Sequence, residues 1–189
     1  MDKRAEANRI VRECMTTALL QLMKEKEFED ISVSEITKRA GVSRTSYYRN
    51  YDSKEDILKQ GLDQVMEGFV RKVSALPKGA GVRDAVQCAF RQGREESAFL
   101  ILIHRAGLDN LLRDRFDSFI LGLTQRVLLL RDGVYPARIL SGALLSALLY
   151  WFDTGMQEPD QELADLFFAC MSGVLALPEI QENSRLRKL

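Results

Sequence analysis

The chain has 189 residues, with 27 lysines and arginines against 27 aspartates and glutamates, so its formal net charge is zero, and 46% of its residues are hydrophobic. This composition excludes a disordered chain, and the length allows a hydrophobic core without disulfide or metal staples. Zero net charge also excludes a protein that coats nucleic acid through a bulk positive excess. Any polyanion would have to meet a local basic patch.

Cysteine usage and the lack of long apolar runs predict a cytoplasmic protein. Cys14, Cys88 and Cys170 are widely separated and form no C-x-x-C pair, so we expect neither a disulfide framework nor a metal site. Residues 1–6 are charged and lack the apolar run of a secretory signal peptide. The longest apolar segment, residues 139–152, is shorter than the roughly 18 residues of a membrane span, so no membrane partner is expected.

The predicted fold class is all-α. Apolar residues recur at spacings of three and four, and the strict alternation that is typical of strands does not persist anywhere. Because a proline inside a helix costs about 3 kcal/mol, we expect the prolines at the ends of helices. Their spacing then leaves nearly the whole chain free to be helical.

Residues 28–58 predict two short helices in succession. Ser32 can cap the first helix through the backbone amide of Glu35, and the Glu35 side chain can reach back to the cap. Gly41 supplies a left-handed residue that ends this helix after little more than two turns. Ser43 is a second cap, at the start of another short helix.

Two short helices joined by a turn that contains a glycine form a helix-turn-helix, whose second helix enters the major groove of DNA. The charge agrees, because the segment between Glu35 and Asp52 has basic residues and no acidic one. Its basic residues are Lys38, Arg39, Arg44 and Arg49. A third cap, Ser53, is expected to start a long helix that reaches about Leu76. A helical hairpin with a solvated basic face is the alternative to DNA binding.

This part of the chain resembles the N-terminal domain of the TetR family of bacterial transcriptional regulators. The resemblance covers about residues 5–60, and its positions are Ile31, Val33, Ile36, Ala40, Gly41, Val42, Ser43, Tyr48, Tyr51, Lys54, Glu55, Ile57 and Leu58. Within the family it is most similar to the group with a Firmicutes-type C-terminal domain. The chain departs from that group at Asn50, where histidine is usual, and at Tyr51, where phenylalanine is usual; Asn50 can still donate to a phosphate.

By position, the resemblance implies two sets of DNA contacts. The base-reading residues would be Arg44, Thr45, Ser46 and Tyr47. The phosphate contacts would be Ser43, Tyr48, Asn50 and Lys54. Arg44 is the expected reader of guanine, because a guanidinium donates two hydrogen bonds to that base. Lys54 stands at the N-terminal end of the long helix, where backbone amides favour a phosphate.

The C-terminal part is expected to be a helical bundle that pairs with a second copy. Its predicted helices are 82–96, 98–112, 114–130, 137–154 and 160–176. The last two carry apolar residues on all sides, so a second chain is expected to cover the face left open. The resemblance implies a homodimer in which these helices form a four-helix bundle. The expected interface residues are Leu140, Gly142, Leu144, Leu148, Trp151, Leu166, Phe167, Met171 and Val174.

Aromatic residues in the same part favour a mostly apolar pocket for a small-molecule effector, although core packing explains each of them singly. The candidates are Phe90, Phe99, His104, Phe116, Phe119 and Tyr150. His104 is the single histidine, and a hydrogen-bonded core or interface residue is its simpler interpretation.

No glycine-rich phosphate loop, H-E-x-x-H motif or catalytic triad is present, so we expect neither an enzyme nor a cofactor. The predicted parts are a DNA-binding domain at 1–60, an effector-binding and dimerisation domain at 61–180 and a tail at 181–189. The resemblance implies a regulator, usually a repressor, that binds a pseudo-palindromic operator as a homodimer and is released by an effector. The alternative is an adaptor of this fold that acts through protein contacts, with weak or no DNA binding.

Overall fold

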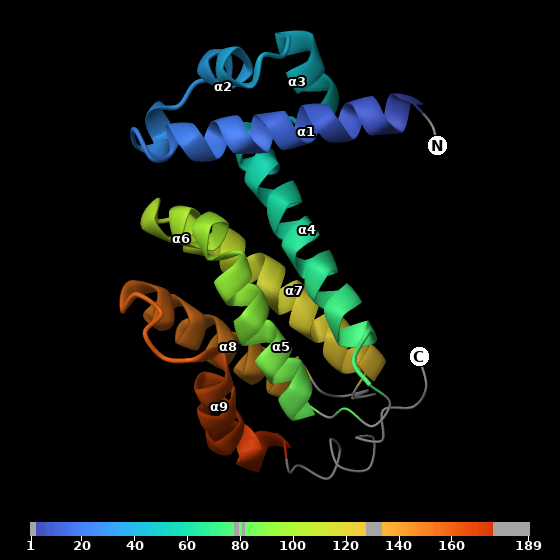
Figure 1. Cartoon of the computed structure of the whole chain (residues 1–189), viewed down its shortest axis with the longest axis vertical. Coiled ribbons are helices and arrows are strands. Elements are labelled where there is room, and N and C mark those ends of the chain that lie inside the picture. Colours follow the sequence, from blue (N-terminus) through green and yellow to red (C-terminus); the bar gives the residue numbers. More distant parts are fainter. Residues whose placement is uncertain (1–2, 78–79, 81, 128–133, 176–189) are drawn as a thin grey trace.

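The computed structural model describes residues 3–77, 80, 82–127 and 134–175. All regular structure in this part of the chain is helical, with nine α-helices and one short 3-10 helix, so the predicted all-α fold is confirmed. Figure 1 shows a small group of helices at one end, a larger group at the other end, and one long helix that runs between them.

The N-terminal group contains the predicted helix-turn-helix. Its elements are α1 (Lys3–Leu22), the 3-10 helix η1 (Phe28–Asp30), α2 (Val33–Ala40), α3 (Arg44–Asn50) and α4 (Lys54–Ser74). In Figure 1, α1 runs crosswise, with α2 and α3 on one side of it and α4 leaving on the other side. The 21-residue α4 is roughly 32 Å long at 1.5 Å per residue, so it extends from this group into the second one.

Local capping defines the bounds of α2. Ser32 Oγ accepts a hydrogen bond from the backbone N–H of Glu35, and the Glu35 carboxylate accepts one from the backbone N–H of Ser32, which confirms the predicted capping box. Gly41 ends α2 with a φ of 67°. A residue with a Cβ rarely adopts this left-handed conformation, so glycine suits the turn that aims α3.

The C-terminal group consists of five helices. They are α5 (Val82–Glu95), α6 (Ser97–Arg105), α7 (Asp109–Val127), α8 (Val134–Asp153) and α9 (Asp160–Leu175). Helix α5 packs on α9, α7 packs on α8, and α4 contacts both α5 and α7. The lower half of α4 is therefore part of this bundle, whereas its upper half contacts α1.

Two local predictions are wrong. Ser53 makes no capping hydrogen bond with its side chain; the carboxylate of Asp56 accepts one from the backbone N–H of Asp52 instead. The single helix predicted over 98–112 is divided into α6 and α7, because Gly107 has a φ of 69° and its N–H bonds back to the last turn of α6. A glycine followed by a helix-starting aspartate was the sequence signal for this break.

Close contacts between helices hold the bundle together. Gly93 on α5 allows Leu148 of α8 to approach its backbone, since a Cβ at position 93 would lie 2.7 Å from the Leu148 side chain. The turn between α8 and α9 is closed by Arg94, whose guanidinium lies 4.6 Å from the centre of the Trp151 ring and donates to the Glu158 carbonyl. Trp151 donates to the same carbonyl at 3.2 Å.

Candidate nucleic-acid interface and effector pocket

Helix α3 has one buried face and one exposed face. Ser43 begins the helix, because its Oγ accepts a hydrogen bond from the backbone N–H of Ser46 at 3.0 Å, and the predicted cap is thereby confirmed. Arg44, Thr45 and Tyr48 are exposed, and 63% of Tyr48 is accessible. Within the described residues, Arg44 and Thr45 have no hydrogen-bond or ion-pair partner. Their donors and acceptors thus remain open to a ligand.

Tyr47 anchors α3 to the core, so the prediction that it reads bases is wrong. Its side chain is fully buried, with Tyr48 and Tyr51 in ring contact at 5.1 and 5.8 Å between centroids. Burial raises the pKa of the Tyr47 hydroxyl to about 12. The spacing of Tyr47 and Tyr51, one helical turn apart, was the sequence signal for an inward face. The two rings fix the rotation of α3 and so select which residues point outward.

Asn50 connects the end of α3 to α1. Its Nδ2 donates to the Ser46 carbonyl at 2.8 Å, and its Oδ1 accepts from Arg12 Nε at 3.1 Å. One amide hydrogen of Asn50 is left for another acceptor. Arg12 is exposed on α1 beside the recognition helix. Sequence reasoning missed this cation, because it lies 38 residues from its partner and carries no motif.

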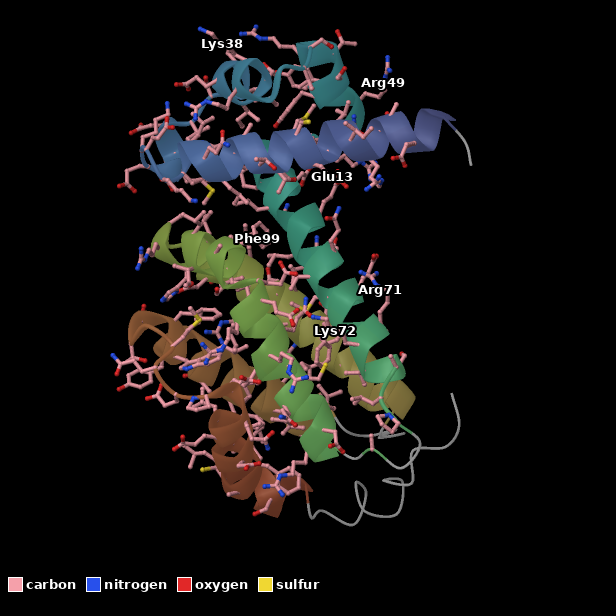
Figure 2. All side chains as sticks on the ribbon, viewed as in Figure 1. Glu13, Lys38, Arg49, Arg71, Lys72 and Phe99 are labelled. Atoms are coloured by element: carbon pink, nitrogen blue, oxygen red, sulfur yellow. The ribbon has the colours of Figure 1, made fainter. Side chains whose placement is uncertain are left out.

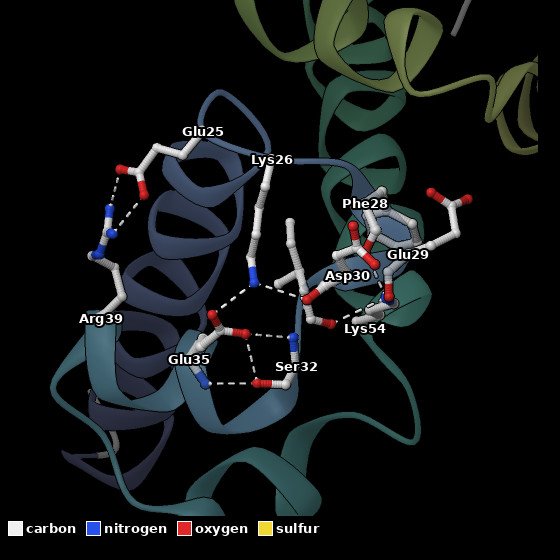
Figure 3. Close-up of polar contacts among 10 residues, drawn as sticks. Glu25, Lys26, Phe28, Glu29, Asp30, Ser32, Glu35, Arg39 and Lys54 are labelled. Atoms are coloured by element: carbon white, nitrogen blue, oxygen red, sulfur yellow. Dashed lines mark hydrogen bonds and ion pairs between the residues drawn. The ribbon is translucent and has the colours of Figure 1, made fainter.

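Lys54 is bound to the protein itself, which contradicts its predicted role as a phosphate contact. Its ammonium donates to the carbonyls of Phe28, Glu29 and Ile31 at 2.6, 2.9 and 3.1 Å, as Figure 3 shows for the region of η1. The same nitrogen lies 4.5 Å from the centre of the Phe28 ring. An ammonium has three hydrogens, so these carbonyls occupy all of them. Lys54 therefore holds the start of α4 against η1 through these hydrogen bonds.

The basic residues of the helix-turn-helix are not equivalent. Arg39 forms a bidentate ion pair with Glu25 of the turn after α1, at 2.7 and 2.8 Å, which lowers the pKa of Glu25 (Figure 3). Lys38, Arg44 and Arg49 are exposed and have no ion-pair partner in the described chain. Figure 2 shows Lys38 and Arg49 on the side of α2 and α3 that faces away from the bundle. This outward side is therefore positively charged.

A small cavity lies between the helices of the bundle. Its volume is about 30 Å³, and it lies between α4, α5, α6, α7 and α8 and is partly open to solvent. The lining residues are Val65, Met66, Phe69, Ala89, Gln92, Gly93, Leu100, Phe116, Phe119, Ile120, Leu144 and Leu148. Two of the predicted pocket residues, Phe116 and Phe119, are among them. Gln92 was not foreseen, because no pattern distinguishes it from the exposed polar residues of α5.

The other predicted pocket residues are not among those that line this cavity. Phe90 is fully buried against Trp151 and Phe167, and Tyr150 is 71% exposed. Phe99 packs on α4 at Gly61, where a Cβ would lie only 2.6 Å from the tip of the ring. None of them lines this cavity, and their predicted role in an effector pocket stays a prediction.

His104 connects three helices and is not part of the cavity. Its Nδ1 lies 2.7 Å from a carboxylate oxygen of Asp109, at the start of α7, and its Nε2 lies 3.3 Å from Asp153, at the end of α8. The hydrogen bond to Asp109 raises the pKa of His104. The simpler interpretation, a hydrogen-bonded histidine between elements, agrees with this placement.

Several predicted interface residues are buried inside the protomer. Leu144, Leu148, Trp151 and Phe167 are at most 8% exposed, so they do not face a second chain in this arrangement. Leu140, Gly142 and Met171 are partly exposed, Leu166 is 60% exposed, and the side chain of Val174 lies outside the described part. Because α8 and α9 carry apolar residues on all sides, their sequences do not indicate which side faces the core. The exposed apolar residues of α8 are Val134, Tyr135, Ile139 and Tyr150.

These features define an all-helical protein with an N-terminal helix-turn-helix and a C-terminal helical bundle. Residues 16–60 match the model of the family described as bacterial regulatory proteins, tetR family. The chain therefore carries the N-terminal domain of the TetR family and has the fold of TetR-family regulators.

Solved structures share this fold at low sequence identity. Lin0861 from Listeria innocua has a TM-score of 0.77 and 17% identity, with 92% of this chain and 94% of that chain covered. A TetR transcriptional regulator from Streptococcus agalactiae has a TM-score of 0.62 and 13% identity, covering 89% and 98%. A tetR-family transcriptional regulator from Streptomyces coelicolor has a TM-score of 0.60 and 18% identity, covering 98% and 89%.

A comparison with curated protein sequences finds no match. Among the described helices, none has both the length and the apolar character that crossing a membrane requires. In the same part of the chain, no group of three or more histidine, cysteine, aspartate or glutamate side chains is arranged to hold a metal ion.

Proposed function

We propose that this chain is a homodimeric transcriptional regulator that binds a pseudo-palindromic DNA operator through α3 and acts as a repressor released by a small molecule. The observation that carries the proposal is the outward face of α3. Arg44, Thr45 and Tyr48 project from a helix whose rotation is fixed by Tyr47. A rigid helix with unpaired donors is suited to reading base edges in the major groove.

The DNA contacts divide into base readers and phosphate contacts. We assign the bases to Arg44 and Thr45, with Ser46 beside them, although its hydroxyl also lies 3.0 Å from that of Ser43. Tyr48 is proposed as a phosphate contact because its hydroxyl ends an exposed side chain. Asn50 can add its remaining amide hydrogen, and the backbone at Ser43 lies at the positive end of α3.

The exposed side of α8 is proposed as the surface that pairs with a second copy. Tyr135, Ile139, Gly142, Ser146 and Tyr150 recur at the spacing of one helix face, and none of them is buried. Exposed apolar side chains at this spacing would be covered by the matching face of a twofold partner, with Leu166 of α9 beside them. Two recognition helices would then meet two half-sites about one DNA turn apart.

Effector release is proposed to start at the cavity. Leu100 of α6 lines the cavity, and the neighbouring Phe99 rests on the backbone of α4 at Gly61. A molecule that displaces Leu100 would therefore move Phe99 against the helix that leads to α3. The proposed domain limits are 1–60 for DNA binding and 61–180 for effector binding and dimerisation, with α4 continuous across the boundary.

DNA binding is tested by fluorescence polarisation with a selected operator at several salt concentrations. Arg44→Ala should cost about 1–3 kcal/mol in binding free energy and relax the preference at one base position. Arg71→Ala, which removes the same charge from an exposed site far down α4 (Figure 2), is the matched control and should change little. Absence of any salt-dependent, sequence-specific binding would support the adaptor alternative.

The dimer is tested by sedimentation of Gly142→Arg. A Cβ at position 142 would meet no atom within 4 Å, so the protomer accommodates the larger side chain while the proposed interface does not. The variant should sediment as a folded monomer. An intact dimer would place the interface on another surface.

A further inference from the structure

One polar side chain is buried in the wall of the cavity. Gln92 is only 5% exposed, and its Nε2 donates to a carboxylate oxygen of Glu96 at 3.3 Å. Its Oε1 has no hydrogen-bond partner among the described residues. The carboxylate of Glu96 determines the amide orientation, because an Oε1 turned toward it would place two acceptors together. The unpaired Oε1 therefore lies on the side of the Gln92 amide that faces away from the Glu96 carboxylate.

The rest of the cavity wall is apolar. Every other lining residue is aliphatic, aromatic, glycine or methionine, and no charged side chain is among them. A charged molecule would lose its hydration here without an opposite charge to replace it. A buried carbonyl oxygen without a donor also costs free energy, which a bound donor would recover.

We propose that this cavity binds an uncharged, mainly apolar molecule that donates one hydrogen bond, from a hydroxyl or N–H group, to Gln92 Oε1. The proposal rests on the effector role proposed above and names the chemistry of the effector. The aromatic walls from Phe69, Phe116 and Phe119 favour a molecule with a ring.

Because the cavity is small, we expect the binding of a ligand to move the residues that line it. A cavity that holds benzene measures about 150 Å³, which exceeds the 30 Å³ present here. A ring-sized molecule must therefore displace part of the wall to be buried there. Leu100 is the wall residue next to Phe99, so its displacement is the movement that reaches α4 at Gly61.

Two probes of nearly equal shape test the proposal: benzyl alcohol, which has a hydroxyl donor, and ethylbenzene, which has a methyl group in its place. Each is titrated into the full-length protein, and the affinities are read from methyl NMR signals of Leu100 and Leu148. Ethylbenzene is the more apolar probe, so the quantity compared is the ratio of the two affinities, benzyl alcohol over ethylbenzene. One paired hydrogen bond implies a ratio about tenfold higher in the wild type than in Gln92→Met. Gln64→Met, at an exposed site of α4 outside the cavity, should retain the wild-type ratio.

Failure of both probes to shift these signals would overturn the proposal without any variant being needed. An affinity ratio that is unchanged in a folded Gln92→Met protein would overturn it as well. Operator binding is measured in parallel by polarisation. If benzyl alcohol binds through Gln92 while the operator stays bound, the ligand chemistry stands and the proposed release mechanism fails.

Discussion

The contact between Phe99 and Gly61 predicts a specific steric conflict. Gly61 is buried in the middle of α4, and the tip of the Phe99 ring would lie 2.6 Å from a Cβ at that position. The other ring atoms closest to it would lie at 3.2 and 3.4 Å. Gly61→Ala therefore forces the ring of Phe99, which is itself 8% exposed, to move within a packed core.

Two opposing effects determine the size of the change. Replacing a helical glycine by alanine stabilises a helix by roughly 0.5–1 kcal/mol, because the unfolded chain loses freedom. Adding a methyl group to a filled core costs about 1–3 kcal/mol. We expect Gly61→Ala to lower the free energy of unfolding by about 1 kcal/mol on balance. In a Phe99→Leu background the conflicting ring atoms are gone, so the same change should stabilise by about 0.5–1 kcal/mol.

The assay is urea unfolding of the wild type, both single variants and the double variant, at one protein concentration because dimerisation is proposed. The coupling between the two sites should be about 2 kcal/mol. An identical effect of Gly61→Ala in both backgrounds would refute the argument that the ring occupies the place of the missing Cβ. The Phe99→Leu protein should also show weaker effector-induced release at unchanged operator affinity.

Three further predictions concern charged groups. Lys54→Met should lower the free energy of unfolding by about 1–3 kcal/mol in urea, since the carbonyls of Phe28 and Ile31, which are partly buried, and the exposed carbonyl of Glu29 lose their donor. The same variant should leave the salt dependence of operator binding unchanged; a slope reduced by about 1 would restore the phosphate role. Asp109 and Asp153 raise the pKa of His104, so its stabilising contribution is complete below about pH 6.5 and is lost as pH rises through the folded-state pKa. The stability deficit of His104→Gln in thermal scans should therefore shrink as the pH rises above that pKa. Hydrogen bonding lowers the pKa of Glu35 to about 2, so its contribution to the free energy of unfolding is complete above about pH 4.5 and is lost toward pH 2. The free energy of unfolding of Glu35→Gln should therefore depend less on pH in this window. An unchanged acid profile would contradict the capping role.

The parts of the fold that depend on neighbouring residues were predictable from the sequence. Ser32, Glu35 and Gly41 set the bounds of α2 through contacts within four residues, and Ser43 does the same for α3. Helical spacing alone then predicted an all-α chain. Such local rules also explain why the helix-turn-helix was identified, since the starts of both helices and the turn between them lie within one short segment.

Contacts between distant residues were not predictable in the same way. Lys54 has its partners 23 to 26 residues earlier in the chain, so its position at a helix start wrongly favoured a phosphate. Tyr47 has a polar end that suggested DNA, but its ring completes a core assembled from several helices. Leu148 lies on a helix that is apolar all round, where only the packing of α5 decides which side is inward.

The fluorescence of Trp151 reports on one of the two groups of helices. It is the single tryptophan of the chain, and it is buried in the bundle beneath Arg94, whereas Tyr47 and Tyr51 are buried in the N-terminal group. Light absorbed selectively by the indole therefore reports on the bundle alone, while the far-ultraviolet dichroism reports on every helix. If the N-terminal group loosens before the bundle does, the two signals will separate on heating, and the emission will stay constant while the helix content begins to fall.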